Sequence, residues 1–187
     1  STPEAAIVRH AIACSPFVSR LLAGDAALLP DLMQKHVAGF GRAEMQDFLA
    51  VQPIVDEVSL KRALRKLRQR VMLRTIVRDL NGLSGLAEVM QAMSDLAEVT
   101  VNVALGHIET WLKVTYGEPI GESGQPQSLV VIGMGKLGGY ELNVSSDIDL
   151  IFAFEEDGET NGVAQGKSTL SNHEFFTRVA KKLIAAI

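Results

Sequence analysis

Cysteine is almost absent from this sequence, since Cys14 is the only one. A single cysteine excludes an internal disulfide and a multi-cysteine metal site, and we expect a small buried apolar residue at this position. The four histidines are too dispersed along the chain to suggest a metal site. Any metal that this chain binds is therefore expected to depend on carboxylates.

Long hydrophobic runs and an excess of basic charge are also missing. No apolar run reaches the roughly 18–20 residues that would span a bilayer, and no signal-peptide pattern opens the chain. The net charge of −4 gives no global reason to expect nucleic acid. We therefore expect a cytoplasmic protein with neither a membrane nor a nucleic acid as its partner.

What the chain has in quantity is apolar residues, which make up 47% of its 187 positions. That is enough for one large domain or two small ones. The chain begins at Ser1 without methionine and stops at Ile187 inside an amphipathic helical pattern, so we interpret it as a piece of a longer protein.

The periodicity of the apolar residues changes along the chain. Residues 1–117 predict a helical region, with long helices over 55–80 and 86–116 and several shorter ones before Pro53. Residues 118–128 have the glycine and proline content of a linker. Residues 129–187 predict strands over 129–132 and 148–154, a loop over 156–172 and a final helix over 173–187, capped by Asn172. The predicted fold class is α+β, a helical bundle followed by a core with a small mixed sheet.

One helix is unusually basic. The segment from Lys61 to Arg78 holds eight of the 18 lysines and arginines and no acid. We expect these side chains to form a solvated helix face, with a docking surface for an acidic partner as the alternative. RNA binding is disfavoured because the segment has no aromatic residue on which a base could stack.

The most informative stretch is VVIGMGKLGGYELNVSSDIDLIFAF, from Val130 to Phe154. It predicts an apolar strand, a glycine-rich turn and a second strand that opens with Asp147 and Asp149. In a strand this spacing puts both carboxylates on one face, where they repel each other and lose hydration. A divalent cation is the usual compensation. Glycines just upstream can bring backbone N–H groups up to a phosphate, so the stretch indicates nucleotidyl or phosphoryl transfer.

Other interpretations of the glycine turn are weaker. Gly133, Gly135 and Gly138 spell the dinucleotide-binding pattern, but the eight residues between Gly138 and Asp147 are too few for a crossover helix. The Walker A pattern fails, because Gly138 is not followed by lysine and serine or threonine. A turn without a ligand would explain the glycines and leave the acid pair unexplained.

The remaining interpretation is a nucleotidyltransferase fold related to DNA polymerase β, whose signature is a Gly-Gly or Gly-Ser turn followed by an Asp-x-Asp strand. Eleven residues separate Gly135 from Asp147. This spacing, and the block GMGKLGGYELNVSSDIDLIF, resemble the glutamine synthetase adenylyltransferase and adenylyl-removing family closely. The resemblance continues through NHEFFTR at 172–178 and the Arg-Asp-Leu at 78–80, and covers about residues 60–187.

The resemblance implies an enzyme that acts on glutamine synthetase. Members of the family carry two nucleotidyltransferase domains, one attaching AMP to a tyrosine with ATP and one removing it by phosphorolysis to give ADP. The helical stretch before the motif resembles the N-terminal, removing half. A nitrogen-signalling regulatory protein and glutamine control the family's two activities.

The resemblance also implies roles for particular residues. Asp147 and Asp149 would be catalytic and hold one or two Mg²⁺ ions. The residues expected to bind the nucleotide, ATP or ADP, are Gly135, Lys136, Gly138, Gly139, Ser145 and Ser146, with capping of the turn as the favoured role of the two serines. The superfamily's third carboxylate is placed beyond Ile187, so we expect these 187 residues to bind metal–nucleotide weakly and not to turn over. The alternatives are an enzyme of the same fold with another acceptor and a nucleotide sensor without chemistry.

Overall fold

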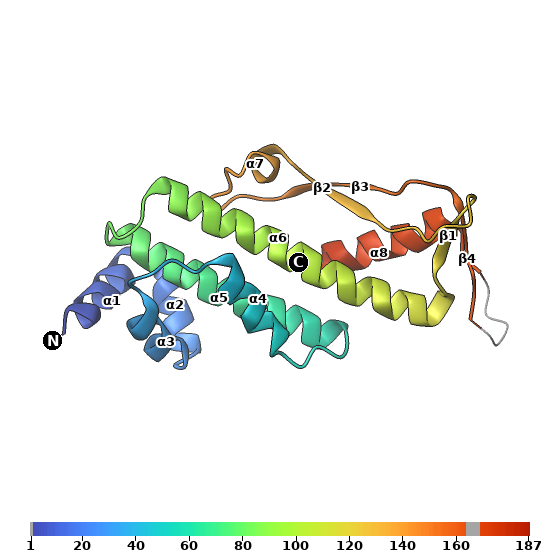
Figure 1. Cartoon of the computed structure of the whole chain (residues 1–187). Helices are drawn as coiled ribbons and strands as arrows, with labels where there is room; N and C mark the ends of the chain where they lie inside the picture. Colours follow the sequence, from blue (N-terminus) through green and yellow to red (C-terminus); the bar gives the residue numbers. More distant parts are fainter. Residues whose placement is uncertain (1, 164–168) are drawn as a thin grey trace.

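Two long antiparallel helices, α5 (Glu57–Leu80) and α6 (Leu86–Tyr116), form the centre of the molecule (Figure 1). The computed structural model describes residues 2–163 and 169–187. Asp56 caps α5, where its carboxylate accepts a hydrogen bond from the Ser59 N–H at 2.7 Å. The Ser59 hydroxyl accepts one in return from the Asp56 N–H at 3.0 Å, which completes a capping box. Both long helices predicted from the sequence are confirmed.

Four short helices precede this pair, as predicted: α1 (Pro3–Cys14), α2 (Pro16–Gly24), α3 (Leu28–Lys35) and α4 (Arg42–Ala50). The first three form a second, smaller apolar core against the C-terminal half of α5. Cys14 is exposed at the end of α1, so the prediction of a buried thiol is wrong. Within the part of the chain that the structure describes, no single helix is long and apolar enough to span a membrane, and α1 with α2 reaches that composition only as a pair bent by 116°.

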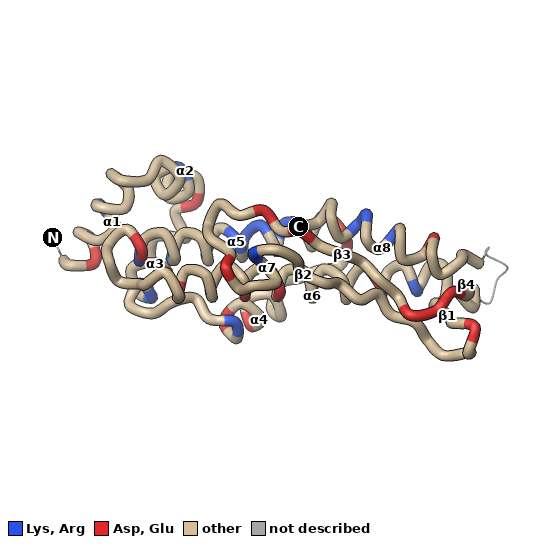
Figure 2. Tube along the Cα trace, turned by 90° about the horizontal axis from the view of Figure 1, so that it is seen from above, with Lys and Arg blue, Asp and Glu red and all other residues tan. Residues whose placement is uncertain are grey.

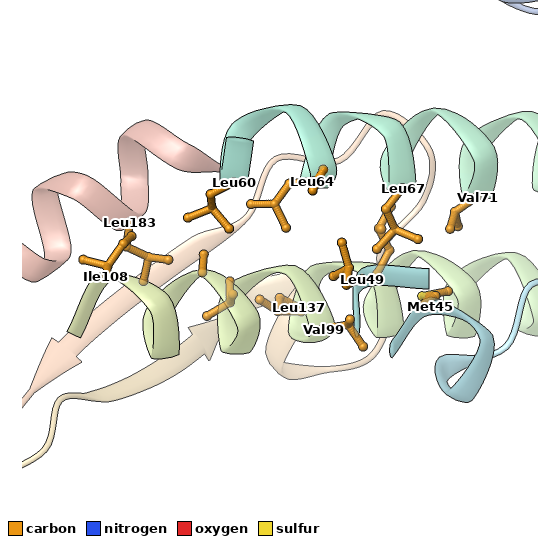
Figure 3. Close-up of a cluster of buried hydrophobic side chains, with 14 of the residues drawn as sticks. Met45, Leu49, Leu60, Leu64, Leu67, Val71, Val99, Ile108, Leu137 and Leu183 are labelled. Atoms are coloured by element: carbon orange, nitrogen blue, oxygen red, sulfur yellow. The ribbon is translucent and has the colours of Figure 1, made fainter. Parts of the chain in front are cut away.

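The larger core lies where α4, α5, α6 and α8 (Asn172–Ala186) meet (Figure 3). One face of α5 supplies the side chains Leu60, Leu64, Leu67 and Val71. Helix α8 adds Phe175, Phe176, Val179 and Leu183, all buried, which confirms the predicted amphipathic helix. Residues before 118 and residues after 128 share this core, so the helical region packs directly against the segment that follows the predicted linker. The division into domains at 118–128 stays a prediction.

The cap of α8 differs from the prediction. Ser171 is the N-cap and accepts a hydrogen bond from the Glu174 N–H, while Asn172 is fully buried as the first helical residue. The Asn172 amide donates to the carbonyl oxygens of Ile120 at 3.0 Å and Glu156 at 3.1 Å. Asn172 therefore joins α8 to the segments around residues 120 and 156, a contact that local sequence does not encode.

The strands form two small antiparallel sheets, so the predicted mixed sheet is wrong for the described residues, while the α+β class holds. Strand β2 (Val130–Met134) pairs with β3 (Asp149–Ala153). Strand β1 (Pro119–Gly121), inside the predicted linker, pairs with β4 (Gly158–Thr160), inside the predicted loop. A three-residue strand containing proline and glycine has linker composition and forms only through its partner. Residues 164–168 of the predicted loop lie outside the described residues.

The β2–β3 hairpin runs along α6 with one face open (Figure 1). Val130, Ile132 and Ile151 on that face are 52%, 45% and 47% exposed. The short apolar run of the first strand suits a buried strand, but here it belongs to a strand that is covered on one side only.

The basic helix is divided into two parts with different surroundings. Arg74 and Arg78, in its C-terminal half, are buried, so the prediction of a solvated face is wrong there. Arg74 donates to Glu44 of α4 at 2.8 and 3.1 Å and lies 4.2 Å from the centre of the Phe40 ring. Burial alone would raise the pKa of Glu44, but the hydrogen bonds from Arg74 and Lys35 outweigh it and lower that pKa below its usual value. This half of α5 joins helices, whereas the lysines and arginines of the N-terminal half, coloured blue in Figure 2, are half-buried or exposed.

Candidate functional site

The glycine turn and the acid strand meet at one end of the β2–β3 hairpin. Helix α7 (Gly135–Gly138) follows β2 directly, and the register pairs Met134 with Asp149, the first residue of β3. Gly135 adopts the left-handed φ of 53°, and a Cβ atom there would lie 3.5 Å from Asp149 Oδ2. The Asp149 carboxylate therefore lies next to Gly135, the first residue of α7.

The turn packs tightly at Gly138. A Cβ atom at this position would lie 2.7 Å from the carbonyl oxygen of Gly133, closer than real side chains come. The Gly139 N–H donates to the Gly135 carbonyl at 3.0 Å. In this geometry the Gly139 N–H is not free to cradle a phosphate, contrary to the expected role of that group. Lys136 is exposed on the same turn.

Asp147 and Asp149 are both exposed, and they alternate with the half-buried Ile148 and Leu150. This alternation places the two acids on one face, in agreement with their spacing. Since both are exposed, they keep more of their hydration than the sequence argument assumed. No group of three metal-ligating side chains occurs among residues 2–163 and 169–187. A pair of carboxylates still fits Mg²⁺, which commonly takes one or two protein carboxylates together with phosphate oxygens and water.

Ser145 and Ser146 form a local turn with Asn143. The Asn143 amide oxygen accepts hydrogen bonds from both serine hydroxyls, at 2.9 and 3.1 Å. It also accepts one from the Ser145 N–H at 3.0 Å. These contacts fit the capping role, and they hold the segment that leads into Asp147.

A pocket of about 430 Å³ opens beside this segment. It lies between α5, α6, residues 142–148 and the last three residues of the chain. Its floor is apolar, with Leu64, Leu96 and Ile148 among the lining residues. Its polar lining residues are Lys61, Arg65, Arg68, Thr100, Asn143, Ser146 and Asp147. Such a volume and mixed lining are typical of small-molecule sites.

Sequence reasoning missed the part of this pocket that α5 supplies. The three basic residues precede Asp147 by about 80 positions, and their spacing at 61, 65 and 68 shows only that they share one face of a helix.

Tyr140 links the glycine turn to the helical region. It is the only non-glycine residue among those described with a left-handed φ, 58°. Its hydroxyl accepts a hydrogen bond from Arg42 at the start of α4, at 2.8 Å. Arg42 also donates to Asp95 of α6 at 2.8 Å and pairs with Glu98. Hydrogen bonding to the Glu98 carboxylate raises the pKa of Tyr140 and also that of Arg42.

We expect Arg42→Gln to destabilise the chain and loosen this turn. Asp95, whose side chain is 8% exposed, would lose its charged partner, and we expect a loss of about 1–2 kcal/mol in the free energy of unfolding. Urea unfolding measures it. The control is Lys113→Gln, which removes a half-exposed pair with Glu118 and should cost at most about 0.5 kcal/mol. Equal effects of the two changes would contradict the role given to Arg42.

Comparison with known proteins agrees with these observations. The family model described as glutamate-ammonia ligase adenylyltransferase matches residues 5–187. A protein of Nitrosomonas europaea named bifunctional glutamine synthetase adenylyltransferase/adenylyl-removing enzyme is 44% identical over the whole chain and 20% of its own length. Proteins of the same name from Pseudomonas aeruginosa and Burkholderia pseudomallei are 42% and 52% identical, over 96% and 70% of this chain and 18% and 14% of their own lengths.

The chain thus spans about a fifth of the length of the first of these relatives. The match nevertheless runs through both the helical region and the glycine–aspartate site. This chain belongs to the glutamate-ammonia ligase adenylyltransferase family.

Proposed function

We propose that this chain forms part of a nucleotidyltransferase core that removes or attaches AMP on a tyrosine of glutamine synthetase. The observation that carries the proposal is the position of the Asp149 carboxylate over Gly135, with Asp147 on the same exposed face. The names of the relatives supply the acceptor and the reaction.

The proposed roles follow from the arrangement of the site. Asp147 and Asp149 would hold Mg²⁺, and Lys136, which is exposed on the neighbouring turn, would place a positive charge near the phosphates. Bound there, Mg²⁺ would neutralise the negative charge that develops on phosphate oxygens in an in-line displacement. The tight packing of Gly138 against Gly133 keeps the turn close to the start of β3. The Asn143 turn orients the segment that carries Asp147.

Of the two activities, we favour adenylyl removal. The helical stretch that precedes the motif and the Arg78-Asp79-Leu80 sequence support the N-terminal half of the family's enzymes. In that reaction an oxygen of inorganic phosphate attacks the phosphorus of the adenylyl group. The bond from phosphorus to the tyrosyl oxygen breaks, the proton of the hydrogen phosphate ends on that oxygen, and the products are ADP and an unmodified tyrosine side chain of glutamine synthetase. A nitrogen-signalling protein would regulate the whole enzyme.

The test measures ADP release from adenylylated glutamine synthetase by the full-length protein that contains these residues, with Mg²⁺ and phosphate. We expect release to depend on phosphate and to fall by at least about 10³-fold in Asp147→Asn, because the variant loses a metal ligand. The matched control is Asp157→Asn, an exposed acid that lies outside the motif. Its activity should be unchanged.

Three other outcomes would each contradict one part of the proposal. AMP attachment without phosphate-dependent release would assign the attaching half. Activity on a different acceptor alone would assign another substrate, and nucleotide binding without turnover would assign a sensor.

A further inference from the structure

The basic residues of the pocket have no described partner. Lys61, Arg65 and Arg68 lie on one face of α5 and line the pocket that Asp147 also lines. None of them takes part in an ion pair among residues 2–163 and 169–187. Their neighbours further along the helix behave differently, since Arg70, Arg74 and Arg78 all pair with carboxylates. We call Lys61, Arg65 and Arg68 the α5 basic wall.

Three positive charges around one concave surface favour an anion. Among the side chains that line the pocket only Asp147 carries a carboxylate, so the ionisable side chains are net positive. Arginine side chains bind phosphate oxygens through paired hydrogen bonds, and lysine adds a point charge.

The wall shares its pocket with the segment proposed to carry the chemistry. Asn143, Ser146 and Asp147, from the segment that leads into β3, line the same pocket. An anion bound there would lie within one pocket with both α5 and the segment that leads into the acid strand. The apolar floor from Leu64, Met93 and Leu96 leaves room for a group that is not charged.

We propose that the α5 basic wall binds a phosphate group at this pocket and thereby completes the anion site from the helical region. This rests on the proposed function in that the phosphate would belong to the reaction, either as free orthophosphate or as the phosphates of a nucleotide. The shared chemistry is a phosphate dianion or polyphosphate held by Lys61, Arg65 and Arg68.

The test is equilibrium binding of three probes to the 187-residue chain, measured by titration calorimetry. The probes are inorganic phosphate, ADP with Mg²⁺, and adenosine as the ligand without phosphate. We expect Arg65→Gln and Arg68→Gln each to weaken phosphate or ADP binding by roughly tenfold, since each removes a charged contact, and adenosine binding to stay unchanged. Arg65→Lys should recover part of the affinity, because it restores the charge.

The matched controls are Arg62→Gln and Lys66→Gln, exposed residues of the same helix that do not line the pocket. They remove the same charge, so they correct for the general electrostatic effect of one fewer cation. Circular dichroism verifies that every variant is folded. A selective loss of orthophosphate binding would assign the wall to the free anion, and a selective loss of ADP binding would assign it to the nucleotide; both support the proposal.

Two outcomes overturn it. In one, the wall and control variants weaken binding equally; in the other, the unsubstituted chain binds neither phosphate nor ADP at millimolar concentration. This binding assay needs no glutamine synthetase. If the wall variants weaken phosphate binding but the full-length protein releases no ADP, the proposed function alone is refuted. If ADP release depends on Asp147 but the wall variants do not weaken binding, this inference alone is refuted.

Discussion

Replacement of Arg78 by methionine is expected to lower the free energy of unfolding by about 3 kcal/mol, because loss of the buried guanidinium leaves its hydrogen-bond acceptors unpaired. Arg78 is 6% exposed. It donates to both Glu88 oxygens, at 2.7 and 3.0 Å, and to the carbonyls of His36 and Leu83, each at 2.8 Å. These contacts tie α5 to the segment after α3 and to the start of α6. Methionine fills similar space and donates no hydrogen bond.

Urea unfolding followed by circular dichroism measures this effect, and the thermal midpoint should fall by roughly 6–12 °C. The control is Arg62→Met on the exposed part of the same helix, where we expect a change within about 0.5 kcal/mol. A loss below about 1 kcal/mol for Arg78→Met would mean that water replaces the arginine at no net cost.

The second large effect is expected at Gly138. Alanine there would bring a Cβ atom within 2.7 Å of the Gly133 carbonyl oxygen, and neither of these backbone segments can yield without moving α7 away from β2. A displacement of this kind costs about 1–3 kcal/mol of stability. Under the proposed function, ADP release by the full-length protein should fall by about 10²-fold, since the turn would move relative to Asp149.

Gly139→Ala is the matched control one position along. Gly139 has an ordinary φ of −87°, and the nearest atom to an added Cβ lies at 3.5 Å, an ordinary contact. Stability should therefore change by less than about 0.5 kcal/mol. If both alanine variants lose stability and activity to the same extent, the close packing at Gly138 is not what holds the turn.

The parts of the site that were predictable are those encoded within one short stretch. The spacing of Asp147 and Asp149 is enough to place them on one face, and the glycines before them are enough to predict a turn. The structure adds that Gly135 is the glycine beneath Asp149 and that Gly138 is the one that packs most tightly.

The parts that were missed depend on contacts between distant segments. Tyr140 meets Arg42 across 98 residues, and Asn172 meets Ile120 across 52. Strands β1 and β4 are each too short to be recognised without the other. The predicted solvated face of the basic helix was wrong in part for the same reason. The sequence shows where the charges are, but only the packed structure shows that Arg74 and Arg78 are buried while Arg65 is not.

The pairing of β2 with β3 gives Asp149 a second role, in specifying strand alignment. Because side chains alternate along a strand, a slip of one residue would turn Asp149 toward the core and expose Leu150 and Phe152. Burying an unpaired carboxylate costs several kcal/mol, which adds to the cost of exposing the two apolar side chains. The carboxylate proposed to hold the metal thus also helps to select the alignment that brings it over Gly135, and neutralising Asp149 would weaken strand alignment as well as the proposed metal binding.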